Sequence, residues 1–221
     1  TQVHIGCAAL LKALAAEGHE VTHLRSHDVA EFFPLTLEEL DAYDVVLLSD
    51  VGANTLLLPP VVFEEGRRAP NRLKLLREWV QRGGGLMMAG GYLSFQGFEA
   101  KANYFDTPIE EILPVTLLPY DDRVEAPEGA EGALTDVEHP VTAGLDREWP
   151  AILGYQKLAA RDDATVLAEV EGRPLLVVRE VGKGRTLAYA SDISPHWAPQ
   201  EVMDWAGYGK LFGQAVEWLA G

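Results

Sequence analysis

Three short segments of the chain combine glycines with side chains that can bind or transform a polar molecule. They span residues 49–55, 89–97 and 191–199, and each follows an apolar run with the character of a buried strand. In open parallel sheets, ligands bind at the carboxyl ends of the strands. We therefore expect the three segments to line one crevice. Its candidate residues are Asp50, Asn54, Gly90, Gly91, Tyr92, Ser94, Asp192 and His196.

The catalytic candidates among them are His196, Asp192, Tyr92 and Ser94. His196 can act as a general base that Asp192 orients, with Ser94 or Tyr92 as the reacting group. The alternative for each residue is structural. A strand-end serine often bonds locally, and a loop histidine beside Trp197 can simply be packed and hydrogen-bonded.

The ligand-binding candidates are Asp50, Asn54, Gly90 and Gly91. Two glycines at a strand end let the backbone approach a ligand or expose N–H groups to an anion, but they equally permit a tight turn. Asn54 can contact a polar ligand or close a local turn through its own amide.

No metal site and no cofactor is expected. The carboxylates Asp121 and Asp122 precede Arg123, which favours a solvated turn with a local ion pair over a metal site. The single cysteine, Cys7, lies in an Ala- and Leu-rich helical segment and is expected to pack as a small apolar side chain. Residues 182–184 (Gly-Lys-Gly) join two β-rich runs, which indicates a hairpin turn and not a phosphate loop.

Helix and strand patterns alternate in the first half of the chain, and strands follow one another in the second half. Helices are expected over residues 4–17, from a capping box at 36–39, and over 71–82, 107–113 and 208–219. Strands are expected at 20–24, 44–49, 86–89, 115–118, 165–170, 174–179 and 185–191. Loops are expected at 50–70 and 121–138.

This order predicts the α/β class, as a three-layer α/β/α sandwich with an antiparallel C-terminal extension. The short connections between the last three strands imply antiparallel neighbours. No linker divides the chain, so residues 1–221 are expected to form a single domain. Because the first helix of such a fold normally follows a central strand, we expect a further strand before Thr1.

The chain has 221 residues with 34 acidic and 18 basic side chains, a formal net charge of −16. This charge disfavours nucleic acid and anionic membranes as partners. No apolar run reaches the length of a membrane span, and a single cysteine suits a reducing compartment, so a cytoplasmic location is expected. Aromatic residues near Phe32, Phe33 and Trp205 would suit a homo-oligomer if they are exposed.

Four segments of the chain resemble the class I glutamine amidotransferase-like cytoplasmic proteins. They are residues 44–60 (DVVLLSDVGANTLLLPP), 83–115, 121–125 and 191–199, and the likeness runs from about residue 8 to residue 220. The resemblance implies a flavodoxin-like fold of the amidotransferase type.

In amidotransferases of this class, a cysteine on the turn after a central strand attacks the glutamine amide, and a histidine from a later strand end is the base. The matching turn here, Gly90-Gly91-Tyr92, has no cysteine, whereas His196 corresponds to the histidine. The resemblance thus implies a protein without ordinary glutaminase activity that binds a small polar ligand or a partner at the crevice. The alternative is a hydrolase of a small polar substrate with His196 as its base.

Overall fold

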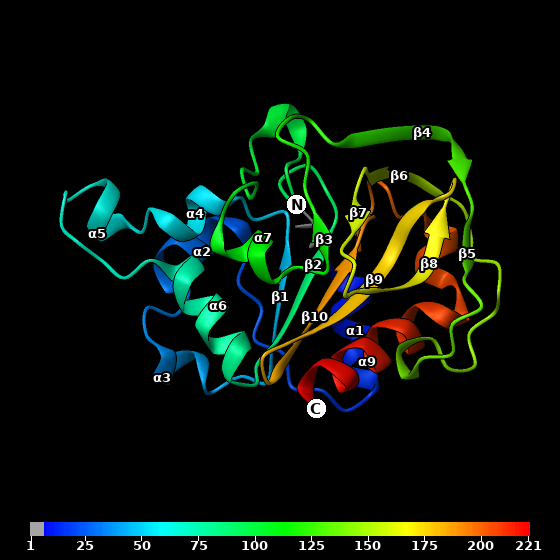
Figure 1. The fold of residues 1–221 in the computed structure, drawn as a ribbon, viewed down its shortest axis with the longest axis horizontal. Coiled ribbons are helices and arrows are strands. Elements are labelled where there is room, and N and C mark those ends of the chain that lie inside the picture. Colours follow the sequence, from blue (N-terminus) through cyan, green and yellow to red (C-terminus); the bar gives the residue numbers. More distant parts are fainter. Residues whose placement is uncertain (1–6) are drawn as a thin grey trace, which may run out of the picture.

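A six-stranded sheet with helices on both faces forms the centre of the computed structural model, which describes residues 7–221 (Figure 1). Three strands run parallel to one another: β1 (Val45–Ser49), β2 (Gly85–Ala89) and β10 (Gly184–Tyr189). The sheet continues through three antiparallel pairings in the order β1-β2-β10-β9-β8-β5. These further strands are β9 (Arg173–Val181), β8 (Thr165–Val170) and β5 (Gly132–Leu134). The protein is therefore a mixed α/β protein with a mostly antiparallel sheet.

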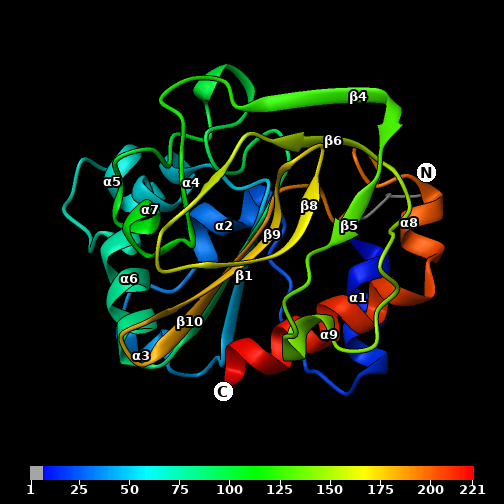
Figure 2. The same ribbon diagram turned by 45° about the vertical axis from the view of Figure 1, so that its right-hand side comes forward.

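Two groups of helices cover the opposite faces of this sheet (Figures 1 and 2). Thr186 of β10 donates a hydrogen bond to the carbonyl of Ile112 in α7 (Pro108–Ile112), which packs against α6 (Arg72–Arg82). Tyr189 lies three residues after Thr186 on β10, and its ring packs edge-on against Phe212 of α9 (Ala206–Ala220). Helix α1 (Ala8–Ala16) also packs against α9. Because side chains alternate between the faces of a strand, α7 and α9 lie on opposite sides.

The remaining elements are short and lie around the ends of the sheet. A ribbon of β4 (Arg123–Ala130) and β6 (Ile152–Gln156) crosses above the carboxyl ends of the parallel strands (Figure 1). A second ribbon pairs β3 (Val115–Thr116) with β7 (Ala159–Ala160). The short helices are α2 (Ser26–Phe32), α3 (Leu37–Leu40), α4 (Ala53–Leu57), α5 (Pro60–Phe63) and α8 (Gln200–Asp204), with 3₁₀ turns at Phe98–Ala100 and Pro140–Thr142.

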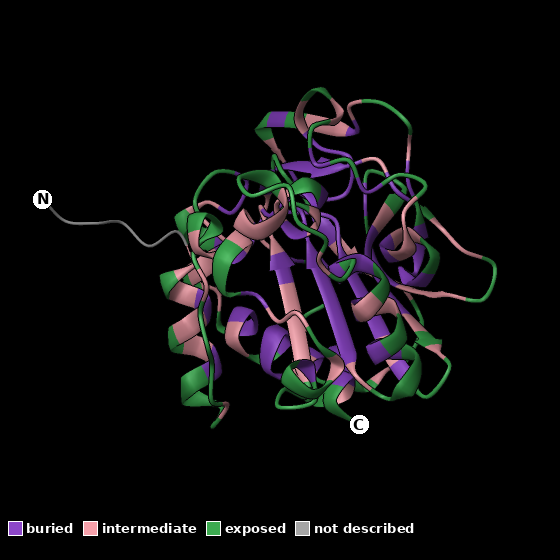
Figure 3. Cartoon of the chain, turned by 90° about the vertical axis from the view of Figure 1, so that its left-hand side faces the viewer, coloured by how far each residue is buried: buried purple, intermediate pink, exposed green. Residues whose placement is uncertain are grey.

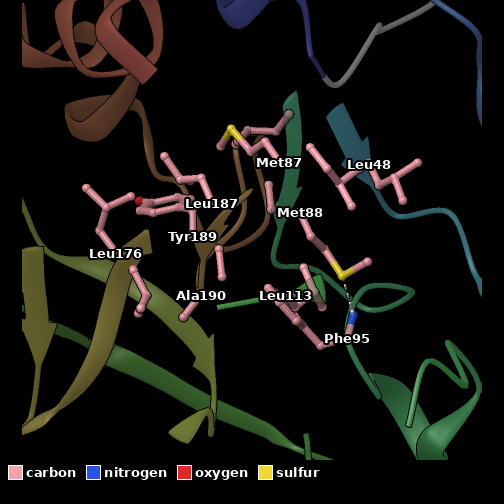
Figure 4. Packing of buried hydrophobic residues seen from close by; sticks show 14 of the residues in the cluster. Leu48, Met87, Met88, Phe95, Leu113, Leu176, Leu187, Tyr189 and Ala190 are labelled. Carbon is pink, nitrogen blue, oxygen red and sulfur yellow. Dashed lines mark hydrogen bonds between the residues drawn. The ribbon is translucent and has the colours of Figure 1, made fainter. Parts of the chain in front are cut away.

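The hydrophobic core is centred on β2, all of whose residues are buried. Met87 and Met88 are fully buried on its two faces, because β2 lies between β1 and β10 and helices cover both sides (Figure 4). Met88 also accepts a hydrogen bond from the backbone N–H of Phe95 through its sulfur at 3.3 Å. Burying each such side chain contributes about 2 kcal/mol, so the core rigidly holds the strand that carries Gly90 and Gly91.

Several predicted elements are confirmed. The capping box forms, since Thr36 Oγ1 accepts from the Glu39 N–H and the Glu39 carboxylate accepts from the Thr36 N–H, both at 3.2 Å. Strands β8, β9 and β10 are antiparallel neighbours, and residues 182–184 turn between the last two of them. Residues 4–6 of the first expected helix lie outside the described residues.

The strand expected at residues 20–24 is wrong, because this segment pairs with none of the described strands. β1 also differs from the expectation of a strand buried on both faces. It is the edge strand of the described sheet, and Val45, Val46 and Leu47 are only half-buried (Figure 3). An apolar run therefore indicated a strand correctly without indicating its place in the sheet.

Two segments expected to be loops contain regular structure. Residues 50–70 hold α4 and α5, and residues 121–138 hold β4 and β5. Strands β6 and β7 were not expected at all. Their sequences are too short and too mixed in polarity for a periodic pattern, and tertiary pairing alone makes them strands.

The aromatic residues considered for an oligomer interface differ in exposure. The side chain of Phe32 is 62% exposed, but Phe33 is buried and Trp205 is partly covered by Trp149, with ring centroids 5.4 Å apart. Phe32 alone of the three thus presents a large apolar surface. No helix within residues 7–221 is both long enough and apolar enough to traverse a bilayer.

Candidate functional site

The carboxyl ends of β1 and β2 are joined through Asp50 and the turn that follows β2, residues 90–94, which we call the elbow turn. The Leu93 N–H donates to Asp50 Oδ1 at 2.8 Å, and the Asp50 N–H donates to Ser94 Oγ at 3.0 Å. Asp50 has a φ of +49°, a left-handed conformation that costs a non-glycine residue free energy. The paired hydrogen bonds hold it there.

Gly91 makes room for the Asp50 carboxylate. Its φ is +142°, and a Cβ placed on it would lie 2.5 Å from Asp50 Oδ1. No side chain fits at position 91 while Asp50 keeps its place. The carboxylate of Asp50 thus occupies the space that a side chain at position 91 would take.

Gln156, at the end of β6, contacts the elbow turn through its side chain. It was not among the predicted site residues. Its side chain is fully buried, and its Nε2 donates to the carbonyl oxygen of Gly91 at 2.5 Å. A Cβ on Gly90 would lie 2.4 Å from Gln156 Oε1, so Gly90 is also confined to glycine by this contact. No sequence signal pointed to Gln156, because the strand that carries it was not recognised.

Asp192 and His196 form an acid–imidazole pair beyond the end of β10. The Asp192 side chain is buried, and its Oδ1 accepts from the N–H and the hydroxyl of Ser194 at 2.9 and 2.8 Å. Its Oδ2 lies 3.7 Å from Nδ1 of His196, whose side chain is 37% exposed. Burial, reinforced by the negative charge of Asp50, raises the pKa of Asp192 to about 6.

Tyr92 projects from the elbow turn into a cluster of aromatic and charged groups. Its hydroxyl donates to Glu125 Oε1 at 3.0 Å, and Trp197 Nε1 donates to Glu125 Oε2 at 2.9 Å. The rings of His196 and Tyr92 meet edge-on with their centroids 4.3 Å apart, and the guanidinium carbon of Arg123 lies over the Tyr92 ring, 4.4 Å from its centroid. The hydrogen bond to Glu125 raises the pKa of Tyr92, so its phenol stays protonated. Glu125 was not among the predicted site residues.

Ser94 is hydrogen-bonded to another candidate, Asp50, whereas Asn54 is not. Ser94 is buried, and its hydroxyl accepts the hydrogen bond from the Asp50 backbone. Asn54 lies exposed in the first turn of α4, and its side chain has no hydrogen-bond partner within the part of the chain that the structure describes. Seven of the eight candidates therefore lie together in the fold: Asp50, Gly90, Gly91, Tyr92, Ser94, Asp192 and His196.

The loop after the elbow turn is strained and held by Asp122. Five non-glycine residues of this loop have positive φ: Phe95, Glu99, Ala100, Asn103 and Asp106. Asp122 is fully buried and accepts from the N–H groups of Gln96 and Gly97 at 3.0 and 2.8 Å. The solvated turn expected at residues 121–123 is therefore wrong for Asp122, although the ion pair of Asp121 with Arg123 forms at 2.9 Å.

Cys7 lies at the start of α1, partly exposed, with its sulfur 3.2 Å from Nε2 of His23. Burial raises the pKa of its thiol, which disfavours a reactive thiolate. Within residues 7–221, no three or more His, Cys, Asp and Glu side chains gather so as to hold a metal ion.

A pH-dependent stability is expected from Asp192. Its pKa is higher in the folded protein than its ordinary value, so the folded state binds more protons between the two values, and this group's contribution to stability falls as pH rises through about 6. Asp50, His196, Tyr189 and Tyr208 are the titratable groups that interact with it. Relative to Asp192→Asn, the unaltered protein should gain about 1 kcal/mol in unfolding free energy between pH 7.5 and pH 5.

Urea unfolding of both proteins at the two pH values measures this difference. Asp136→Asn is the matched control, because Asp136 is exposed and pairs only with Arg147. Parallel pH profiles for Asp192→Asn and the unaltered protein would contradict the expectation.

Fold and site together define a mixed α/β protein with a cluster of polar side chains around a glycine turn at the carboxyl ends of its parallel strands. The chain belongs to the family described as "Putative glutamine amidotransferase", whose model matches residues 1–221. Comparison with curated protein sequences gives no match.

Some solved structures resemble the chain in both sequence and fold, and others resemble it in fold alone. A cytoplasmic protein of Salmonella typhimurium LT2 is 42% identical with a TM-score of 0.95, over 99% of this chain and 89% of that one. A second cytoplasmic protein of Salmonella typhimurium is 43% identical with a TM-score of 0.94, over 97% and 87%. The β-galactosidase of Rahnella sp. R3 is 17% identical with a TM-score of 0.59, over 95% of this chain and 26% of that enzyme, and shares the fold alone.

Proposed function

We propose that this protein is an amidotransferase-like protein that binds a small polar ligand at the crevice around the elbow turn and does not hydrolyse glutamine through a cysteine thioester. The observation that carries the proposal is that a side chain of this protein occupies the space at the elbow turn where a nucleophile would lie. The Asp50 carboxylate fills the space beside Gly91 and takes the N–H group of Leu93. In a thioester mechanism, that space must hold a thiol, and backbone N–H groups there must be free for an oxyanion.

The other groups at the crevice support binding over catalysis. Tyr92 is held as a protonated phenol by Glu125, and Ser94 is buried with its hydroxyl accepting from the Asp50 N–H. Neither presents an activated oxygen. The half-exposed side chain of His196 and the partly exposed side chain of Tyr92 offer a ligand polar and aromatic contacts instead.

A glutaminase assay tests this proposal. The purified protein should release no more ammonia and glutamate from glutamine than a protein-free control does, and Cys7→Ser should behave identically. Glutamine turnover that His196→Ala abolishes would falsify the proposal. Turnover lost in Cys7→Ser instead would identify Cys7 as a nucleophile and would equally overturn it.

A second candidate is a hydrolase with His196 as the base, favoured by the 3.7 Å approach of its Nδ1 to the Asp192 carboxylate. Such a pair orients and polarises an imidazole. Under this alternative, turnover of an ester, amide or glycoside substrate should fall about 100-fold in His196→Ala. It should change little in the control variant His27→Ala, because His27 is exposed and lies on α2.

We extend the proposal to architecture and location. The arrangement of parallel strands with helices on both faces supports a three-layer, flavodoxin-like version of the class I amidotransferase fold.

The names of the Salmonella relatives support a cytoplasmic location, and the exposed Phe32 supports a homo-oligomer. Sedimentation of the purified chain and of Phe32→Ser tests the last point.

A further inference from the structure

Helix α5 and the turn that follows it, residues 60–68, lie outside the core of the molecule, and we call this segment the arm. The arm projects at the outer edge of the molecule beside α4 (Figures 1 and 2). No residue of α5 is buried, and Val61, Val62 and Phe63 neither belong to the hydrophobic core nor pack against it. Within the part of the chain that the structure describes, the hydrogen bonds of the arm stay inside residues 59–67. The arm therefore keeps its shape through local bonds and presents its side chains outward.

The arm carries the most exposed large apolar side chain of the described residues. The side chain of Phe63 is 76% exposed, and that of Phe32, the next most exposed, is 62% exposed. Phe32 lies on α2, which packs against α4, the helix that precedes the arm. Because burying a phenylalanine side chain contributes about 2 kcal/mol, a partner that covers Phe63 gains free energy that the single chain does not use.

The charged side chains of the arm stand in a self-complementary order. Residues 64–68 read Glu-Glu-Gly-Arg-Arg, with two negative side chains before the glycine and two positive ones after it. The arm is thus neutral in a chain whose net charge is −16. Two copies of such an acidic chain repel each other least where the facing surfaces carry no net charge. When two arms face each other across a two-fold axis that passes by Gly66, the negative pair of each copy lies opposite the positive pair of the other.

These charged side chains are available for such pairing. All residues from 63 to 68 are exposed. Within residues 7–221, the arm contains the ion pair of Arg67 with Glu65 at 2.6 Å, whereas Glu64 and Arg68 form none. Because an exposed ion pair contributes little free energy, exchanging this pair for one with a second copy costs little.

From the exposed phenylalanine and the charge order of the arm, we infer that the arm is the contact surface of a homodimer, in which the arms of two copies face each other across a two-fold axis. Each copy shields Phe63 of the other, and the glutamates of each pair with the arginines of the other. This inference rests on the homo-oligomer proposed above, names its surface, and is independent of ligand binding at the elbow turn. A contact made by two short arms is small, so the dissociation constant should be on the order of 10–100 µM.

Sedimentation velocity tests the inference, with two double variants that reverse the charges of the arm. The unaltered protein should pass from monomer to dimer between about 5 and 500 µM. One variant combines Glu64→Arg with Glu65→Arg, and the other combines Arg67→Glu with Arg68→Glu. Each variant alone brings like charges together and should dimerise at least about tenfold more weakly. An equimolar mixture of the two should recover the dimer, because every facing pair is again opposite in sign.

Phe63→Ser should also weaken the dimer at least about tenfold, whereas the control Arg147→Glu, at an exposed position away from the arm, should leave it unchanged. Since no side chain of α5 is buried, all arm variants should unfold at the same urea concentration as the unaltered protein. A protein that stays monomeric up to about 500 µM would overturn both the arm contact and the proposed homo-oligomer, and would leave the ligand proposal standing. A dimer that persists in the arm variants, or that the mixture fails to recover, would overturn the arm contact alone.

Discussion

Gly91→Ala should lower the free energy of unfolding by at least about 3 kcal/mol. Two costs combine. At a φ of +142°, an alanine is in a conformation that L-residues rarely adopt. In addition, its Cβ would lie 2.5 Å from Asp50 Oδ1, so the carboxylate must move and lose the hydrogen bond from Leu93. Urea unfolding followed by tryptophan fluorescence measures the loss.

Gly83→Ala is the matched control for this substitution. Gly83 has almost the same φ, +137°, but a Cβ there would meet nothing within 4 Å. It should therefore show the conformational cost alone, about 1–2 kcal/mol. In an Asp50→Gly background, the cost of Gly91→Ala should fall to that of Gly83→Ala, because the obstructing carboxylate is gone. Equal costs for the two alanine variants in the unaltered background would show that Asp50 does not occupy the space beside Gly91.

Arg72→Met should destabilise the protein by about 3–5 kcal/mol. Arg72 is fully buried at the start of α6, and its guanidinium donates to the carbonyls of Pro34, Ala30 and Phe33 at 3.2, 2.8 and 2.7 Å. These carbonyls lie at the C-terminal end of α2 and just beyond it, where a cation is favoured. Methionine fills similar space but leaves the carbonyls without a donor.

Arg67→Met is the control for the charge and size of the replacement. Within the described residues, Arg67 forms an ion pair only with the exposed carboxylate of Glu65. Removing the Arg67 guanidinium should therefore cost no more than about 0.5 kcal/mol of unfolding free energy. An Arg72→Met variant as stable as Arg67→Met would mean that the guanidinium does not anchor α2 to α6.

The amino-acid sequence by itself determined the elements with strong local signals. The box at Thr36 and Glu39 is formed by neighbours in the chain, and the hairpin at residues 182–184 needs only a short glycine turn between two apolar runs. The grouping of Asp50, the elbow turn and His196 was also predictable. Parallel strands end at one edge of a sheet, so the residues that follow them must meet there.

Only the tertiary structure decided which side chains of the site contact one another. Nothing local in the sequence indicates that the Asp50 side chain turns across to the space beside Gly91, because that contact joins positions more than 40 residues apart. Gln156 and Glu125 lie on strands whose patterns are too weak to recognise, and they act through contacts made across the fold. The burial of Asp122 likewise depends on the loop that folds over it. Polar contacts between distant segments depend on three-dimensional placement, and periodicity in a sequence reports only which face of an element is apolar.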